Sequence, residues 1–76
     1  MEIRFTLHSR LRMKLRGIDE KEVLKTFTES NWKETGKEGT EIAIRVLNDK
    51  ELCIVYLPKT DYNLIITVYK RSKKRR

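Results

Sequence analysis

The chain has 76 residues, a formal net charge of +7, and equal shares, 38% each, of hydrophobic and charged residues. This length holds one domain, and the composition is too apolar for a disordered chain and too poor in Gly and Pro for a low-complexity one. A single cysteine and a single histidine rule out an intramolecular disulfide and a multi-cysteine zinc site, so we expect neither a metal nor a cofactor.

The first segment predicts a short strand followed by a helix. Residues 2–5 alternate polar and apolar side chains, which is typical of a strand. Three leucines then recur at every fourth position: Leu7, Leu11 and Leu15. This spacing predicts a helix that begins after Thr6, ends at Gly17 and buries the leucine stripe in the core.

A second helix is predicted directly after the first. Asp19 is followed three residues later by Glu22, the spacing of a capping box. Ile18 before the cap and Val23 inside the helix are placed for a hydrophobic staple. The helix should run to about residue 28 with Val23, Leu24 and Phe27 as its apolar face.

The second half of the sequence predicts three strands. Residues 29–39 are polar and form a loop with room for an irregular edge strand. Residues 40–47, 51–57 and 62–70 alternate or are continuously apolar, and the turns 48–50 and 58–61 separate them, which indicates an antiparallel meander. The helices should cover either the face of Ile42, Ile44 and Val46 or the alternate face.

These elements predict an α+β fold in which two N-terminal helices pack on a small antiparallel sheet, in the order β-α-α-β-β-β. The domain spans residues 1–70, and residues 71–76 form a basic C-terminal tail. The longest apolar run, 52–57, is too short to cross a membrane, and no N-terminal run resembles a signal peptide. We therefore expect a soluble, cytoplasmic protein.

The positive charge is concentrated in two blocks. Residues 1–18 carry a net charge of +4 and residues 70–76 carry +6, whereas residues 19–69 carry −3. Such blocks indicate a polyanionic partner such as RNA, DNA or an acidic protein. The alternative is a solvated helix face together with a solubilising tail.

Three basic side chains of the first helix form a candidate site. His8, Arg12 and Arg16 follow one another at four-residue spacing along the edge of the leucine stripe. An imidazole that is half-buried beside guanidinium groups stays neutral, and it can transfer a proton while the arginines hold phosphate oxygens. The alternative is a histidine at the core boundary beside a solvated basic flank.

The last predicted strand offers a second group of candidates. Thr67, Tyr69 and Arg71 share one face of this strand. A tyrosine hydroxyl near an arginine serves as a proton carrier or a stacking group, although Tyr is also an ordinary strand residue. Cys53 lies in the middle of a strand, where a small core residue is expected in preference to a nucleophile.

The segment His8-Ser9-x-x-Arg12-Met13-x-x-Arg16-Gly17-Ile18 closely resembles the hallmark His-Ala-x-x-Arg-Met-x-x-Arg-Gly-Ile of a family of small uncharacterised prokaryotic domains. The resemblance extends from Ile3 to Lys70, with Ser9 in place of Ala, a change that a helix surface tolerates. That family is similar in fold to the RelE/ParE-like and BrnT-like toxins of toxin–antitoxin systems. These toxins belong to a larger set of metal-independent ribonuclease folds that includes barnase.

The resemblance implies a RelE/barnase-like fold and a toxin that acts as a metal-independent endoribonuclease on RNA, including ribosome-bound mRNA. His8 would be the acid or base, Arg12 and Arg16 would hold the phosphorane oxygens, and Tyr69 with Arg71 would complete the pocket. The basic residues that would follow the RNA backbone are Arg71, Lys73, Lys74, Arg75 and Arg76. An acidic antitoxin would be the protein partner. The alternative is a non-catalytic module of the same fold that binds nucleic acid or protein.

Overall fold

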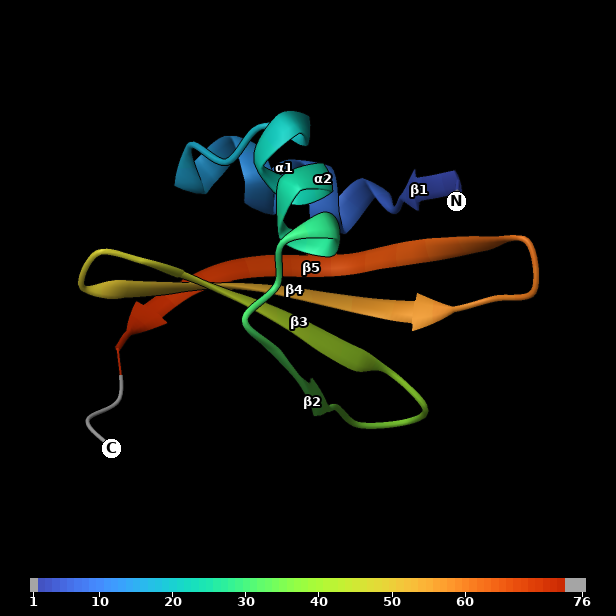
Figure 1. Ribbon diagram of the computed structural model, residues 1–76. Helices are drawn as coiled ribbons and strands as arrows, with labels where there is room; N and C mark the ends of the chain where they lie inside the picture. Colours follow the sequence, from blue (N-terminus) through green and yellow to red (C-terminus); the bar gives the residue numbers. More distant parts are fainter. Residues whose placement is uncertain (1, 74–76) are drawn as a thin grey trace.

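The fold is a five-stranded mixed sheet with two helices on one of its faces (Figure 1). The computed structural model describes residues 2–73. The elements are β1 (Glu2–Phe5), α1 (Leu7–Arg16), α2 (Glu20–Thr28), β2 (Trp32–Thr35), β3 (Glu41–Leu47), β4 (Lys50–Pro58) and β5 (Tyr62–Ser72). The predicted α+β class is confirmed, and the loop expected at 29–39 contains the edge strand β2.

The sheet has the strand order β1-β5-β4-β3-β2. Strands β3, β4 and β5 pair antiparallel, as the meander predicted, whereas β1 pairs in parallel with β5 and makes the sheet mixed. Strand β5 also continues to Ser72, which pairs with Lys50. Arg71 and Ser72 therefore belong to the last strand and not to the tail that was expected from residue 71.

The helix ends follow the predicted caps. The Thr6 hydroxyl accepts a hydrogen bond from the Ser9 amide at 3.0 Å, and Gly17 ends α1 in the left-handed conformation with φ of 64°. Asp19 and Glu22 form the predicted capping box at the start of α2. These caps satisfy amide groups that the first turn of each helix leaves unpaired.

The buried face of α1 differs from the prediction, which placed the leucine stripe in the core. Leu7, Leu11 and Leu15 are 77%, 54% and 74% exposed, whereas Ser9 and Met13 on the opposite side are 0% and 5% exposed. The small Ser9 side chain lets α1 approach the sheet closely, and its hydroxyl donates to the Thr6 carbonyl oxygen at 2.8 Å. Ser9 is thus a packing residue and does not lie on a helix surface as expected.

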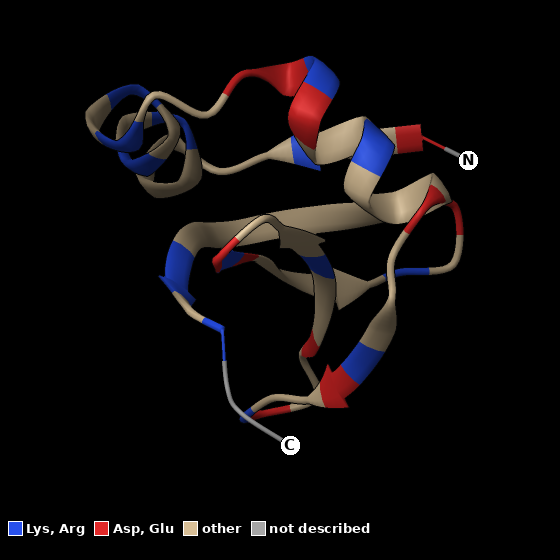
Figure 2. Ribbon diagram, turned by 60° about the vertical axis from the view of Figure 1, so that its left-hand side comes forward, with Lys and Arg blue, Asp and Glu red and all other residues tan. Residues whose placement is uncertain are grey.

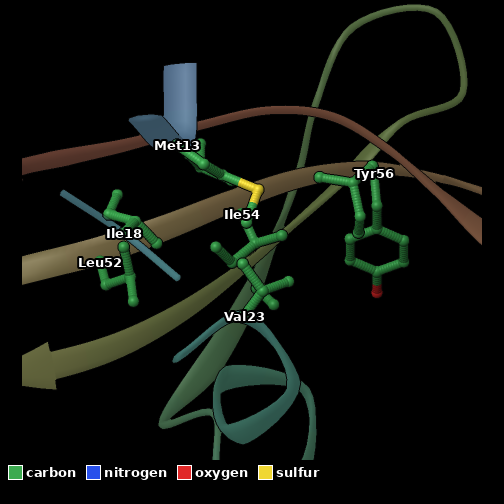
Figure 3. Close-up of a cluster of buried hydrophobic side chains, with 9 residues drawn as sticks. Met13, Ile18, Val23, Leu52, Ile54 and Tyr56 are labelled. Carbon is green, nitrogen blue, oxygen red and sulfur yellow. The ribbon is translucent and has the colours of Figure 1, made fainter. Parts of the chain in front are cut away.

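The core lies between the helices and the sheet (Figure 3). Met13 comes from α1, Ile18 from the link after it, Val23 from α2, and Ile54 and Tyr56 from β4. Strand β3 presents Ala43 to this core, so the helices cover the alternate face and not that of Ile42, Ile44 and Val46.

The sheet is strongly curled, and its other face, which the helices do not cover, is concave. One row of cross-strand neighbours runs across it: Trp32, Ile44, Cys53 and Tyr69. Arg71 on β5 contacts Glu34 on β2 at 2.8 Å, although side chains three strands apart would be separated by about 14 Å on a flat sheet. The curl closes this concave face with its own side chains, which explains why Ile44 and Cys53 are fully buried.

Candidate nucleic-acid interface

The α1 ridge, defined as His8, Arg12 and Arg16, lies on the surface of the molecule. Arg12 is partly exposed, and His8 and Arg16 are exposed. Nε of Arg12 donates a hydrogen bond to Nε2 of His8 at 3.4 Å. This contact holds the imidazole ring beside the Arg12 guanidinium.

The predicted position of His8 at the edge of the core was wrong, although Arg12 lies beside it along the ridge. The prediction placed His8 at the edge of a buried leucine stripe, where half-burial would favour the neutral ring. The stripe is exposed, so His8 is not at a core boundary. The Arg12 hydrogen bond is what orients the ring.

The cations of α1 differ in their partners. Arg10 forms an ion pair with Glu20 at 2.7 Å and lies over the Phe5 ring at 4.5 Å from its centre, so it ties α1 to α2 and β1. Among residues 2–73, no carboxylate forms an ion pair with Arg12, Lys14 or Arg16. These three charges are therefore available to a ligand.

Basic residues of α1 and of the end of β5 gather at one end of the molecule (Figure 2). Lys70 is exposed and shares the helix-covered face of β5 with the core residue Val68. Lys73 follows β5 directly and is also exposed. The described parts of the two basic blocks thus lie at the same end of the molecule, whereas the candidates Lys74, Arg75 and Arg76 lie outside the described residues.

The structure does not bring Tyr69 and Arg71 to the α1 ridge. Val68 packs in the core under the helices, so its neighbour Tyr69 and, two residues on, Arg71 point to the concave face. The sheet itself separates them from His8. Sequence reasoning placed Tyr69 and Arg71 correctly on one face but joined that face to the wrong side of the sheet.

Arg71 is the centre of an ion-pair cluster on the concave face. Its Nε contacts Glu51 at 2.7 Å and a terminal nitrogen contacts Glu34 at 2.8 Å. The Glu51 side chain is 1% exposed and that of Arg71 is 23% exposed. The hydrogen bonds to Glu34 and Glu51 raise the pKa of Arg71. This guanidinium is therefore occupied within the protein, and it is a poor candidate for RNA binding.

Cys53 and Tyr69 face each other beside this cluster. Burial raises the pKa of the Cys53 thiol, against the opposing effect of the Arg71 charge. Burial also raises the pKa of the Tyr69 hydroxyl. Both groups stay protonated at neutral pH, which suits a packing role and gives neither residue the ionised form that a nucleophile or base needs.

The α1 ridge falls within a recognised domain family. A family model described as a domain of unknown function, DUF4258, matches residues 5–70. The chain belongs to the DUF4258 family. Searches of curated proteins and of solved structures gave no significant match. The predicted membership of a small uncharacterised family is confirmed, and the DUF4258 match contains the whole α1 ridge but ends before Arg71.

The described part of the DUF4258 chain has neither a metal-binding cluster nor a helix that could span a membrane. Within residues 2–73, no group of three or more His, Cys, Asp or Glu side chains is placed to hold a metal ion. None of the helices described in that range has both the length and the apolar character needed to cross a membrane.

Two surface features of this DUF4258 domain were missed by sequence reasoning. The exposed leucine stripe was assigned to the core, although Met13 lies on the opposite side of the helix, four residues after the small Ser9. A pocket of about 270 Å³ beside α2 had no sequence signal, because its residues come from four separate segments. They are Ile3, Leu24, Phe27, Thr28, Lys33 and Asn63.

Proposed function

We propose that this DUF4258 domain binds RNA through its basic end, formed by Arg12, Lys14 and Arg16 of α1 with Lys70 and Lys73. The observation that carries the proposal is that the three α1 cations have no ion-pair partner within residues 2–73. Arginine holds phosphate oxygens through two parallel hydrogen bonds, and clustered cations bind a nucleic-acid backbone by releasing its counterions.

A charge-removal experiment tests RNA binding. The double substitution Arg12→Gln and Arg16→Gln should weaken binding to single-stranded RNA and flatten the dependence of log affinity on log salt concentration. The slope should fall by about 0.7 for each phosphate contact that is lost. Fluorescence anisotropy with a labelled oligonucleotide at several salt concentrations measures both quantities.

Lys59→Gln is the matched control for this experiment. Lys59 is an exposed cation in the β4–β5 turn, which lies at the opposite end of the sheet from the C-terminal end of β5 (Figure 1). The Lys59→Gln substitution removes one positive charge from the molecule but none from the basic end. If Lys59→Gln weakens RNA binding as much per charge as the α1 substitutions do, the binding reflects only overall charge and the proposed interface is wrong.

Metal-independent RNA cleavage is a second candidate function, as expected of a toxin that an acidic antitoxin would neutralise. It is favoured by the exposed His8 imidazole, which lies within hydrogen-bond distance of Arg12 on the α1 ridge. The His8 imidazole would take the proton of the RNA 2′-hydroxyl once Arg12 has turned from Nε2 of His8 to the phosphate. The 2′-oxygen would attack the phosphorus, and the departing 5′-oxygen would take a proton from water. Arg12 and Arg16 would stabilise the charge on the phosphorane oxygens.

Substitutions on the two sides of the sheet test this cleavage. His8→Gln should lower the cleavage rate by about 10²–10⁴-fold and leave RNA affinity nearly unchanged, because it removes the proton acceptor alone. Tyr69→Phe should leave the rate unchanged, since Tyr69 faces the concave side of the sheet. Single-turnover kinetics measure the rates, and the product should carry a 2′,3′-cyclic phosphate with or without EDTA. Cleavage that requires a divalent ion, or that His8→Gln leaves intact, contradicts this mechanism.

A further inference from the structure

The outward surface of α1 is an exposed apolar stripe, here called the leucine stripe, made of Leu7, Leu11 and Leu15. These side chains are 77%, 54% and 74% exposed. Residues four apart are neighbours on a helix surface, so the three leucines form one continuous row. Ser9 and Met13 anchor the opposite side of α1 to the sheet. The helix is therefore held rigidly with its most apolar row facing outward.

Basic side chains border the leucine stripe along both edges. At about 100° per residue, Lys14 lies on one edge, and His8 and Arg12 lie on the other. Lys14 and Arg12 have no ion-pair partner within residues 2–73. An apolar centre with a charged rim is the usual composition of a protein-binding surface.

We propose that the leucine stripe docks an amphipathic helix of a partner protein whose apolar seam is flanked by Asp and Glu side chains. The apolar seam would cover the leucines, and the carboxylates would pair with Lys14 and Arg12 at the rim. Charge complementarity selects this occupant, because both edges of the stripe are basic. The inference goes beyond RNA binding and does not depend on it.

A second copy of this chain is the wrong occupant on electrostatic grounds. Two α1 helices packed through their leucine stripes would bring Lys14 and Arg12 of one copy against the same cations of the other. Each copy also carries a net charge of +7. Like charges across an interface are unfavourable, so this surface suits an acidic partner and disfavours self-association.

A membrane surface is also a weaker fit than an acidic helix. The three leucine side chains together hold fewer carbon atoms than one myristoyl chain, and a single such chain gives only marginal membrane binding. The stripe contains no aromatic side chain of the kind that anchors proteins at a membrane interface.

The spacing of the stripe defines how the partner helix would lie. Helices whose four-residue ridges interdigitate cross at about −50°. Because α1 has ten residues and is therefore about 15 Å long, one crossing helix fills the stripe. The partner should present apolar anchors at i and i+4 with acidic residues beside them. Arg12 would then contact either this helix or RNA, so the two ligands should compete.

A synthetic amphipathic helix with a leucine seam and glutamate flanks is the direct probe. Its binding to the full chain is measured by anisotropy or calorimetry, next to a peptide in which lysine replaces every glutamate. Leu11→Gln with Leu15→Gln should weaken binding of the glutamate peptide at least tenfold. Lys14→Glu with Arg12→Glu should weaken binding of the glutamate peptide and strengthen binding of the lysine peptide, because these two cations are the ones that would pair with the carboxylates of the partner.

Leu24→Gln is the matched control, because Leu24 is 48% exposed but lies on α2. It should bind the glutamate peptide as the wild type does, and circular dichroism should show that all variants are folded. The proposal is overturned if the wild type does not bind the glutamate peptide, or if Leu24→Gln weakens it equally. It is also overturned if the leucine stripe instead mediates dimers in sedimentation, or drives binding to anionic lipid vesicles in preference to the peptide. Peptide binding without RNA binding would reject the proposed function alone.

Discussion

Arg71→Ala should lower the free energy of unfolding by about 3–5 kcal/mol, the usual result of removing one partner from a buried ion pair. The loss arises because Glu51, whose side chain is 1% exposed, would keep a buried carboxylate without its cation. Glu34 would lose the same partner, and the contact that holds β2 over β5 would disappear. Urea denaturation followed by tryptophan fluorescence measures the change.

Two further variants separate the contribution of the buried charge to stability from the contribution of packing in this cluster. Combining Arg71→Met with Glu51→Leu should recover much of the lost stability, because apolar pairs often replace buried ion pairs without net cost. Lys70→Ala removes an exposed cation from the same strand and should change stability by less than about 0.5 kcal/mol. An Arg71→Ala protein as stable as the Lys70→Ala protein would show that the cluster does not stabilise the curled sheet.

Arg71 also shows why the sequence predicts some contacts and not others. The caps at Thr6 and Asp19 and the Arg12–His8 contact join residues three or four apart on one helix, so local geometry is sufficient to predict them. The Arg71–Glu34 pair joins residues 37 positions apart through the curl of four strands. No pattern near either residue specifies that curl, and Arg71 therefore resembles a tail cation in the sequence.

Local sequence patterns also do not predict on which side of the sheet Tyr69 lies. Alternation in β5 shows that Tyr69 and Arg71 share a face, and this prediction holds. Which face the helices cover depends on the register between β4 and β5, where an irregularity occurs at Val55 and Tyr56. A one-residue shift moves every later side chain to the opposite face. The predicted site combined His8 with Tyr69 because the sequence does not fix this choice.

The orientation of α1 was mispredicted because its sequence has two candidate core sides. The leucine stripe has more apolar surface than Met13 with Ser9, and hydrophobic periodicity alone selects the larger. A small residue such as Ser9, however, permits a close approach between helix and sheet, where Met13 fills the remaining space. The leucines and His8 are thereby left exposed, and Arg12 is left partly exposed.

Two alanine substitutions on opposite sides of α1 test this orientation experimentally. Met13→Ala should cost about 2–5 kcal/mol, the range for truncating a buried large side chain to alanine, because Met13 is 5% exposed. Leu11→Ala should change stability by less than about 0.5 kcal/mol, because Leu11 is 54% exposed and alanine favours the helix at least as well as leucine does. Urea denaturation of both variants under the same conditions gives the comparison.

The opposite ranking of these two variants would change both proposals at once. If Leu11→Ala were the more damaging, the leucine stripe would lie in the core and would have no surface for a partner helix. His8 would then lie at the boundary of the core. With the ranking expected here, the leucine stripe, its basic rim and the His8–Arg12 contact all face solvent on one helix, where the RNA and the acidic helix that we propose would compete for Arg12.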